Sequence, residues 1–152
     1  DMNSLFAILS LIITTINGIS PKSNNEMPKM KCTPLMQDAE KFQIDTEIKF
    51  TVKNVVIDGN NLLADIEYTG SGKEKFNCYW TGIIMKSYPP KTNLSLKIEK
   101  AKAGTKTIAQ KICIDLSELA IKYQKSGIYL ILQGWEGQIP FGIKTEEKKT
   151  EE

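Results

Sequence analysis

Apolar and polar residues alternate along much of this chain, most regularly between Phe42 and Val52. A repeat of two over this length predicts a strand that buries one face and exposes the other. The inward positions would be Phe42, Ile44, Ile48, Phe50 and Val52. We expect the strand to continue into Val55–Ile57 and to form the first half of a hairpin.

The second half of this hairpin follows Asp58–Asn61, whose sequence DGNN contains residue types that tolerate a positive φ. The return strand places an apolar row on the face opposite Asp65 and Glu67. That row consists of Leu62, Ala64, Ile66 and Tyr68. Two alternating runs joined by such a turn predict an antiparallel pair of strands.

Further short strands are predicted after this hairpin, separated by turn residues. They lie in KFNCYW, NLSLKIEK, the segment around Cys113, GIYLIL and QIPFGI. One short helix is predicted in DLSELAIKYQKSG, with Asp115 as its N-cap, Glu118 three residues later and Gly127 closing its end. Many short alternating strands are typical of a sandwich. The predicted fold class is therefore all-β, an antiparallel two-sheet β-sandwich of immunoglobulin-like architecture with one short helix.

The segment Ile128–Leu132 departs from the alternation because it contains no strongly polar residue. One interpretation is a central strand, covered on one side by the facing sheet and on the other by the predicted helix. The other interpretation is that its surplus apolar face lines a ligand cavity between the sheets. Aromatic side chains supply most of the contact area in ligand and protein interfaces. The candidate ligand- or partner-binding residues are Trp80, Tyr129, Trp135 and Phe141.

The length of 152 residues suits one domain. The segment SLFAILSLIITTI is apolar but shorter than the roughly 20 residues that a membrane span needs, which predicts a secretory signal peptide. Asp1 is interpreted as an added residue before a natural start at Met2. The predicted segments are the signal peptide (1–20), an extended linker or edge segment (21–34), the sandwich (35–143) and a disordered charged tail (144–152). We therefore expect a secreted protein without a stable membrane span.

The chain contains three cysteines, and secretion permits disulfides. Three pairings are open, and Cys78–Cys113 is favoured because both residues lie in strand-like segments. Cys32 would then be a third thiol, which could join two copies into a dimer.

The sequence Asn93–Leu94–Ser95 matches the glycosylation acceptor pattern N-x-S. Because it follows Pro89–Pro90, the acceptor is expected in an exposed loop. Such short patterns also occur by chance, so Asn93 is a candidate glycosylation site only.

The amino-acid composition argues against several kinds of catalytic, metal-binding and nucleic-acid-binding function. The chain has no histidine, so no Ser–His or Cys–His nucleophile can form, and the commonest metal ligand is missing. Three cysteines are too few for a four-thiolate zinc site. All 20 basic residues are lysine, whereas readout of nucleic-acid bases relies on arginine. We predict a protein that is not an enzyme and that has no cofactor, metal site or nucleic-acid partner.

Three stretches, KFNCYW in mid-chain, ICIDL and KSGIYLILQGWEGQIPFGI, resemble the MD-2-related lipid-recognition family. The resemblance is clearest in the C-terminal third. It implies a two-sheet sandwich that holds a lipid or sterol between its sheets, in a family of lipid-transfer proteins and lipid co-receptors.

Two functions are predicted on this basis. The first is a secreted, non-enzymatic protein that binds a lipid or another apolar small molecule between the sheets. The second is a secreted interaction module that binds a protein receptor through an exposed sheet face or its loops.

Overall fold

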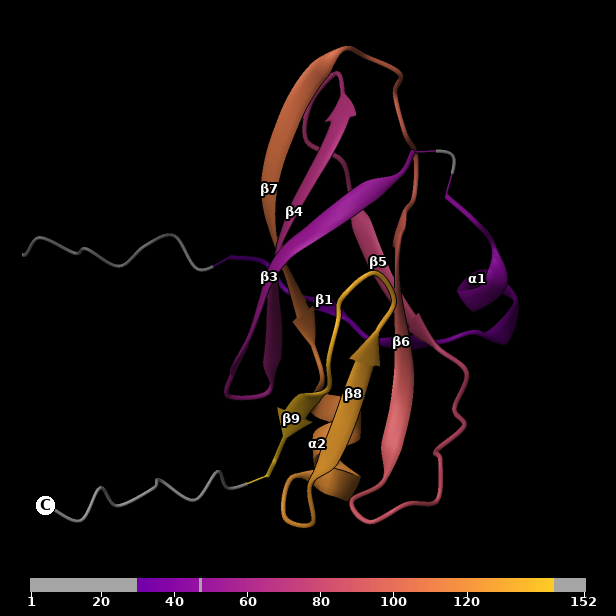
Figure 1. Cartoon of the computed structure of the whole chain (residues 1–152), viewed down its shortest axis with the longest axis vertical. Coiled ribbons are helices and arrows are strands. Elements are labelled where there is room, and N and C mark those ends of the chain that lie inside the picture. Colours follow the sequence, from indigo (N-terminus) through magenta and orange to yellow (C-terminus); the bar gives the residue numbers. More distant parts are fainter. Residues whose placement is uncertain (1–29, 47, 144–152) are drawn as a thin grey trace, which may run out of the picture.

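The computed structural model describes residues 30–46 and 48–143, which form two packed β-sheets and two short helices (Figure 1). The predicted signal peptide, the first part of the predicted linker and the predicted charged tail lie outside the described residues. No helix in the described part of the chain has the length and apolar character needed to cross a membrane.

Each sheet has a simple strand order. The four-stranded sheet runs β1 (Thr33–Pro34), β7 (Lys106–Asp115), β4 (Asn61–Gly70) and β3 (Phe50–Asp58). The five-stranded sheet runs β2 (Met36–Gln37), β5 (Phe76–Trp80), β6 (Lys91–Ile98), β8 (Ile128–Leu132) and β9 (Ile139–Phe141). The helices are α1 (Ala39–Gln43) and α2 (Ser117–Tyr123). The predicted all-β two-sheet sandwich is confirmed.

The sheets are mixed rather than purely antiparallel. β1 pairs with β7, β2 pairs with β5, and β6 pairs with β8, all in the parallel sense. The segment Thr33–Gln37 therefore contributes one strand to each sheet. Between the two strands, Leu35 is buried in the core, and its N–H donates to the carbonyl of Asp115 at 3.0 Å. This segment ties the two layers together along one side.

The core lies between the inner faces of the two sheets. The predicted apolar row of β4 is buried at all four positions, and β3 pairs with it antiparallel as predicted. The five-stranded sheet contributes a matching set of buried side chains: Phe76, Cys78, Trp80, Leu94, Leu96, Ile98, Ile128, Leu130, Leu132, Ile139 and Phe141. These residues alternate along their strands with outward-facing ones, of which Asn77, Tyr79 and Ser95 are buried as well.

The predicted strand beginning at Phe42 is wrong over its first half, because residues 39–43 form α1 and β3 begins at Phe50. The side chain of Asp38 caps α1 by accepting a hydrogen bond from the Lys41 N–H at 3.0 Å. This local cap outweighs the alternating pattern. Ile44, expected to face inward, is 61% exposed.

The predicted helix is confirmed as α2, although it begins at Ser117. The Asp115 carboxylate accepts hydrogen bonds from the Ser117 N–H and hydroxyl, and these bonds lower its pKa. At the other end, the N–H of Gly127 donates to the Tyr123 carbonyl at 2.7 Å, with Gly127 at φ +78°. The predicted N-cap is wrong, because Leu116 is the N-cap and no side chain of the described residues caps the helix, while Asp115 instead binds Ser117 from one residue earlier. The predicted glycine does follow the helix.

The apolar strand β8 has one buried face, not two. Ile128, Leu130 and Leu132 are buried, whereas Tyr129 and Ile131 are half-buried. α2 does not cover this second face, because its Leu119 and Ala120 join the same core as the inward residues of β8. In Figure 1, α2 lies behind β8 and β9, where it closes one end of the sandwich.

The predicted Cys78–Cys113 pairing is wrong, since the disulfide joins Cys32 to Cys113. Cys113 lies between the core residues Ile112 and Ile114, so its side chain is on the outer face of β7, where Cys32 of the neighbouring segment meets it. Cys78 is a buried thiol in the other sheet, and burial raises its pKa to about 12. A dimer through an unpaired cysteine, as predicted, would need an exposed thiol, and the described part of the folded protein has none.

Asn93 is not in a loop as predicted, because it lies within β6 opposite Ile131. Its side chain is exposed on the outer face of the five-stranded sheet. Ser95, the third residue of the acceptor pattern, is buried and donates to the Gln133 side chain at 2.8 Å.

Gly142 provides a first test of the packing at the α2 end. It has φ +66°, and a Cβ added there would lie 2.7 Å and 2.8 Å from the carbonyl oxygens of Gln124 and Tyr123. We expect Gly142→Ala to lower the free energy of unfolding by about 2 to 3 kcal/mol, combining backbone strain with overpacking. Denaturant unfolding measures this change.

Gly59→Ala is the matched control, because Gly59 has φ +59° but no atom near the added Cβ. It should cost about 1 kcal/mol from backbone strain alone. Equal losses in the two variants would contradict the close approach of Gly142 to α2.

Candidate functional site

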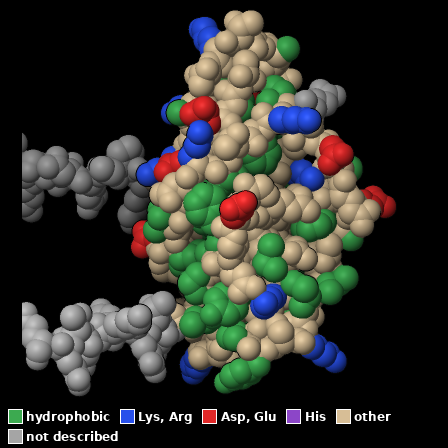
Figure 2. Space-filling model, in the orientation of Figure 1, with side chains coloured by type: hydrophobic (Ala, Val, Ile, Leu, Met, Phe, Trp, Pro, Cys, Tyr) green, Lys and Arg blue, Asp and Glu red, His purple; other side chains and the backbone are tan. Residues whose placement is uncertain are grey.

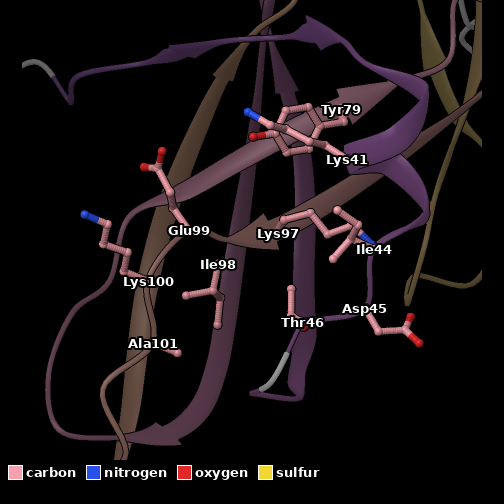
Figure 3. A pocket seen from close by; sticks show the side chains of 10 residues that line it. All are labelled: Lys41, Ile44, Asp45, Thr46, Tyr79, Lys97, Ile98, Glu99, Lys100 and Ala101. Atoms are coloured by element: carbon pink, nitrogen blue, oxygen red, sulfur yellow. The ribbon is translucent and has the colours of Figure 1, made fainter.

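A groove of about 560 Å³ lies between α1, with the residues that follow it, and the β5–β6 pair (Figure 3). We call it the α1 groove. Its lining residues are Lys41, Ile44, Asp45, Thr46, Tyr79, Lys97, Ile98, Glu99, Lys100 and Ala101. They come from segments far apart in sequence, which the fold brings together on the outer side of the five-stranded sheet.

α1 is held on this outer side by Tyr79. The neighbours of Tyr79 in β5, Cys78 and Trp80, belong to the core, so Tyr79 faces the other way. α1 covers it, and the Lys41 ammonium lies 5.7 Å from the centre of the Tyr79 ring in a cation–π contact. The N–H of Asp38 donates to the Trp80 carbonyl at 3.0 Å and fixes the start of the helix on β5.

The opposite wall is formed by the end of β6 and the residues after it. The backbone N–H of Glu99 donates to the carbonyl of Lys75 at 3.0 Å, and the side chains of the two residues form an exposed ion pair at 3.4 Å. The N–H of Lys102 donates to the Glu74 carboxylate at 3.1 Å. The wall is therefore attached to the β4–β5 turn.

A partly buried hydrogen-bond network holds this turn to β4 and β7. The N–H of Glu74 donates to the Tyr68 hydroxyl at 2.9 Å and lies 3.1 Å from Gln110 Oε1, while Gln110 Nε2 donates to the Glu74 carbonyl at 2.7 Å. Burial of the hydroxyl raises the pKa of Tyr68. Since these bonds link β4, β7 and the turn, the groove wall is held in place before any ligand binds.

The charged side chains of the groove differ in direction. In Figure 3, Lys41 lies over the Tyr79 ring and Lys97 extends along the groove toward Ile44. Asp45, Glu99 and Lys100 point outward from it. The groove therefore presents apolar surface mainly from Ile44 and Ala101, beside Lys41 and Lys97, while Ile98 lines it as a residue that is largely buried in the core.

The described residues that line the groove include no cysteine, serine or histidine, and the Thr46 hydroxyl donates to the Ile48 carbonyl at 2.9 Å. Within residues 30–46 and 48–143, no group of acidic, cysteine or histidine side chains is placed to hold a metal ion.

The four predicted aromatic site residues do not form one site, and none of them lines the α1 groove. Trp80 and Phe141 are buried in the core. The Trp80 indole N–H has no hydrogen-bond partner among the described residues. Tyr129 is half-buried on the outer face of β8, and Trp135 is half-buried against the core.

Sequence reasoning missed Tyr79 and Lys97, and a signal for both was present. In KFNCYW, Tyr79 alternates with the apolar row, so it is the aromatic residue that the pattern turns outward. Lys97 is outward in NLSLKIEK for the same reason. The groove could not be predicted, because α1 forms one of its walls and the alternating pattern predicted a strand at that position.

Comparison with known proteins bears on the fold alone. No protein-family model matches the chain, and no curated protein matches it by sequence. The fold is similar to that of a DUF1344 protein of unknown function from Bacteroides vulgatus, with a TM-score of 0.52 and 10% sequence identity over 79% of this chain. This chain spans 59% of the length of that protein. The resemblance to the MD-2-related lipid-recognition family stays a prediction.

Proposed function

We propose that the protein is a non-enzymatic binding domain whose α1 groove takes an amphipathic small molecule with an apolar body and an anionic group, such as a fatty acid. The observation that carries this proposal is the pairing of apolar lining with two inward-lying lysines. An apolar body would cover Ile44 and Ala101, and a carboxylate would accept hydrogen bonds from Lys97 or Lys41.

The size of the groove and the exposed Ile44 support this class of ligand. Small-molecule sites usually measure about 300 to 1,000 Å³ and combine apolar walls with a few placed polar groups. Ile44 is an exposed apolar residue beside the groove, and a bound ligand would remove part of its surface from water.

The proposal keeps the lipid class predicted from the sequence but places the ligand outside the sandwich. Trp80 and Phe141, which were predicted as cavity walls, pack with other side chains in the core. Secretion is part of the proposal, because a disulfide such as Cys32–Cys113 persists in oxidising compartments.

Calorimetric titration with dodecanoate, and with dodecanol as the neutral analogue, tests the proposal. We expect one dodecanoate per chain and much weaker binding of dodecanol. Lys97→Gln should weaken dodecanoate binding about 5- to 10-fold, since a charge-assisted hydrogen bond is lost. Ile44→Ser should weaken both ligands.

Lys53→Gln is the matched control, because Lys53 is an exposed lysine of β3 that does not line the groove. It should leave binding unchanged. If dodecanoate and dodecanol bound equally well, and if neither Lys97→Gln nor Ile44→Ser weakened their binding, the ligand would lie outside the α1 groove. No binding of either ligand would contradict the proposed class.

A further inference from the structure

A second surface, at the end of the sandwich where β6 begins, combines exposed apolar and basic side chains. The connection from β5 to β6 and the end of α2 enclose a hollow of about 810 Å³ there. Tyr88 on its rim is fully exposed, and Pro89 and Ile143 add apolar surface. We call this surface the basic end and define it by Lys86, Tyr88, Pro89, Lys122, Lys125 and Ile143.

The charged side chains that define the basic end are lysines. Lys86, Lys122 and Lys125 are exposed, and among residues 30–46 and 48–143 no aspartate or glutamate lines the hollow. Glu118, the acidic residue of α2, lies one helical turn before Lys122, farther from the hollow in sequence than Lys125, which lines it. On the face shown in Figure 2, this end displays apolar and basic side chains, and the acidic ones lie toward the other half.

Hydrogen bonds hold the backbone of the β5–β6 connection that carries Lys86, Tyr88 and Pro89. Met85 and Lys91 exchange two backbone hydrogen bonds, at 2.7 Å and 3.2 Å, and the Ser87 hydroxyl donates to the Pro89 carbonyl at 2.7 Å. The N–H of Tyr129 donates to the Pro90 carbonyl at 2.9 Å. The loop is therefore held to β6 and β8 while the Tyr88 ring projects away from the core.

We infer that the basic end docks on an anionic lipid bilayer. The exposed lysines favour an anionic partner, and a layer of anionic headgroups would offer acceptors to lysines both on the β5–β6 connection and at the end of α2. A projecting tyrosine suits the headgroup layer, where its ring meets acyl chains and its hydroxyl stays in water. The inference is independent of the α1 groove, which uses other residues.

Cosedimentation of the full chain with vesicles tests the inference. We expect binding to vesicles of phosphatidylcholine mixed with phosphatidylserine, little binding to phosphatidylcholine alone, and loss of binding as salt is raised. The double variant Lys86→Gln/Lys125→Gln should weaken binding at least tenfold, at about fivefold per lysine. Tyr88→Ser should weaken it while leaving the salt dependence unchanged.

The matched control is Lys73→Gln/Lys106→Gln, which removes the same charge from exposed lysines in the β4–β5 turn and at the start of β7. It should bind like the unchanged protein, and circular dichroism should show that every variant is folded. If both double variants weakened vesicle binding equally, the binding would depend only on the net charge of the protein, and the inference would be overturned. No vesicle binding, or Tyr88-dependent binding of a protein instead of lipid, would also overturn it.

Discussion

Removal of the Cys32–Cys113 disulfide is expected to lower the free energy of unfolding by about 4 kcal/mol. The bridge joins residues 81 apart in sequence. Closing a loop of that length removes much of the conformational freedom of the unfolded chain, which corresponds to about 4.5 kcal/mol in the chain-entropy account and 2 to 5 kcal/mol in practice. Since small domains are stable by only about 5 to 15 kcal/mol, this loss should be easily measured.

The experiment compares denaturant unfolding of the oxidised protein, the reduced protein and the variant Cys32→Ser/Cys113→Ser. Reduced protein and variant should lose similar stability, and a reducing agent should not change the variant further. Cys78 should not react with a thiol reagent until the protein unfolds, because it is buried with a pKa near 12.

Peptide mapping without reduction checks the pairing itself. Cleavage after lysine separates the three cysteines into Cys32–Lys41, Phe76–Lys86 and Ile112–Lys122. We expect the first and third peptides to be joined and the second to carry a free thiol. A joined pair that contains Phe76–Lys86 would contradict the pairing and with it the expected loss of stability.

Leu130→Ala is expected to cost about 3 to 4 kcal/mol, the second large effect. Leu130 is completely buried in β8, and truncation leaves a cavity beside a well-packed core. Its neighbour Ile131 is half-buried on the outer face of the same strand. Ile131→Ala should therefore cost only about 1 kcal/mol.

The two variants form a matched pair, since adjacent residues of one strand differ mainly in the face they occupy. Thermal or denaturant unfolding of both gives the contrast directly. Similar large losses at the two positions would mean that something covers the outer face of β8, as the first interpretation of this apolar strand required.

The hairpin β3–β4 and the core row of β4 could be predicted because the alternating pattern and the turn residues both indicate a pair of antiparallel strands. α2 could be predicted because Leu116, Leu119, Ala120 and Tyr123 fall at helical spacing, although the N-cap is Leu116 and not the predicted Asp115. α1 could not, since a five-residue helix has too few positions to show a helical period, and the Asp38 cap that stabilises it is a single local contact.

The cysteine pairing depended on which face of its strand each cysteine occupies. Cys78 alternates in phase with Phe76 and Trp80, while Cys113 is out of phase with Ile112 and Ile114. The strand period of two therefore places Cys78 inside the sandwich and Cys113 on its outside. What the sequence could not supply was the position of Cys32, which depends on the parallel pairing of β1 with β7.

The position of Cys32 near the start of the sandwich has a consequence for synthesis. A chain synthesised from its N-terminus presents Cys32 first, then Cys78, and the native partner Cys113 last. During that interval, Cys78 is the nearer thiol and can compete for Cys32 until β5 is covered by its neighbours. The order in which the strands are buried therefore decides how much of the newly made protein needs disulfide exchange to reach its native form.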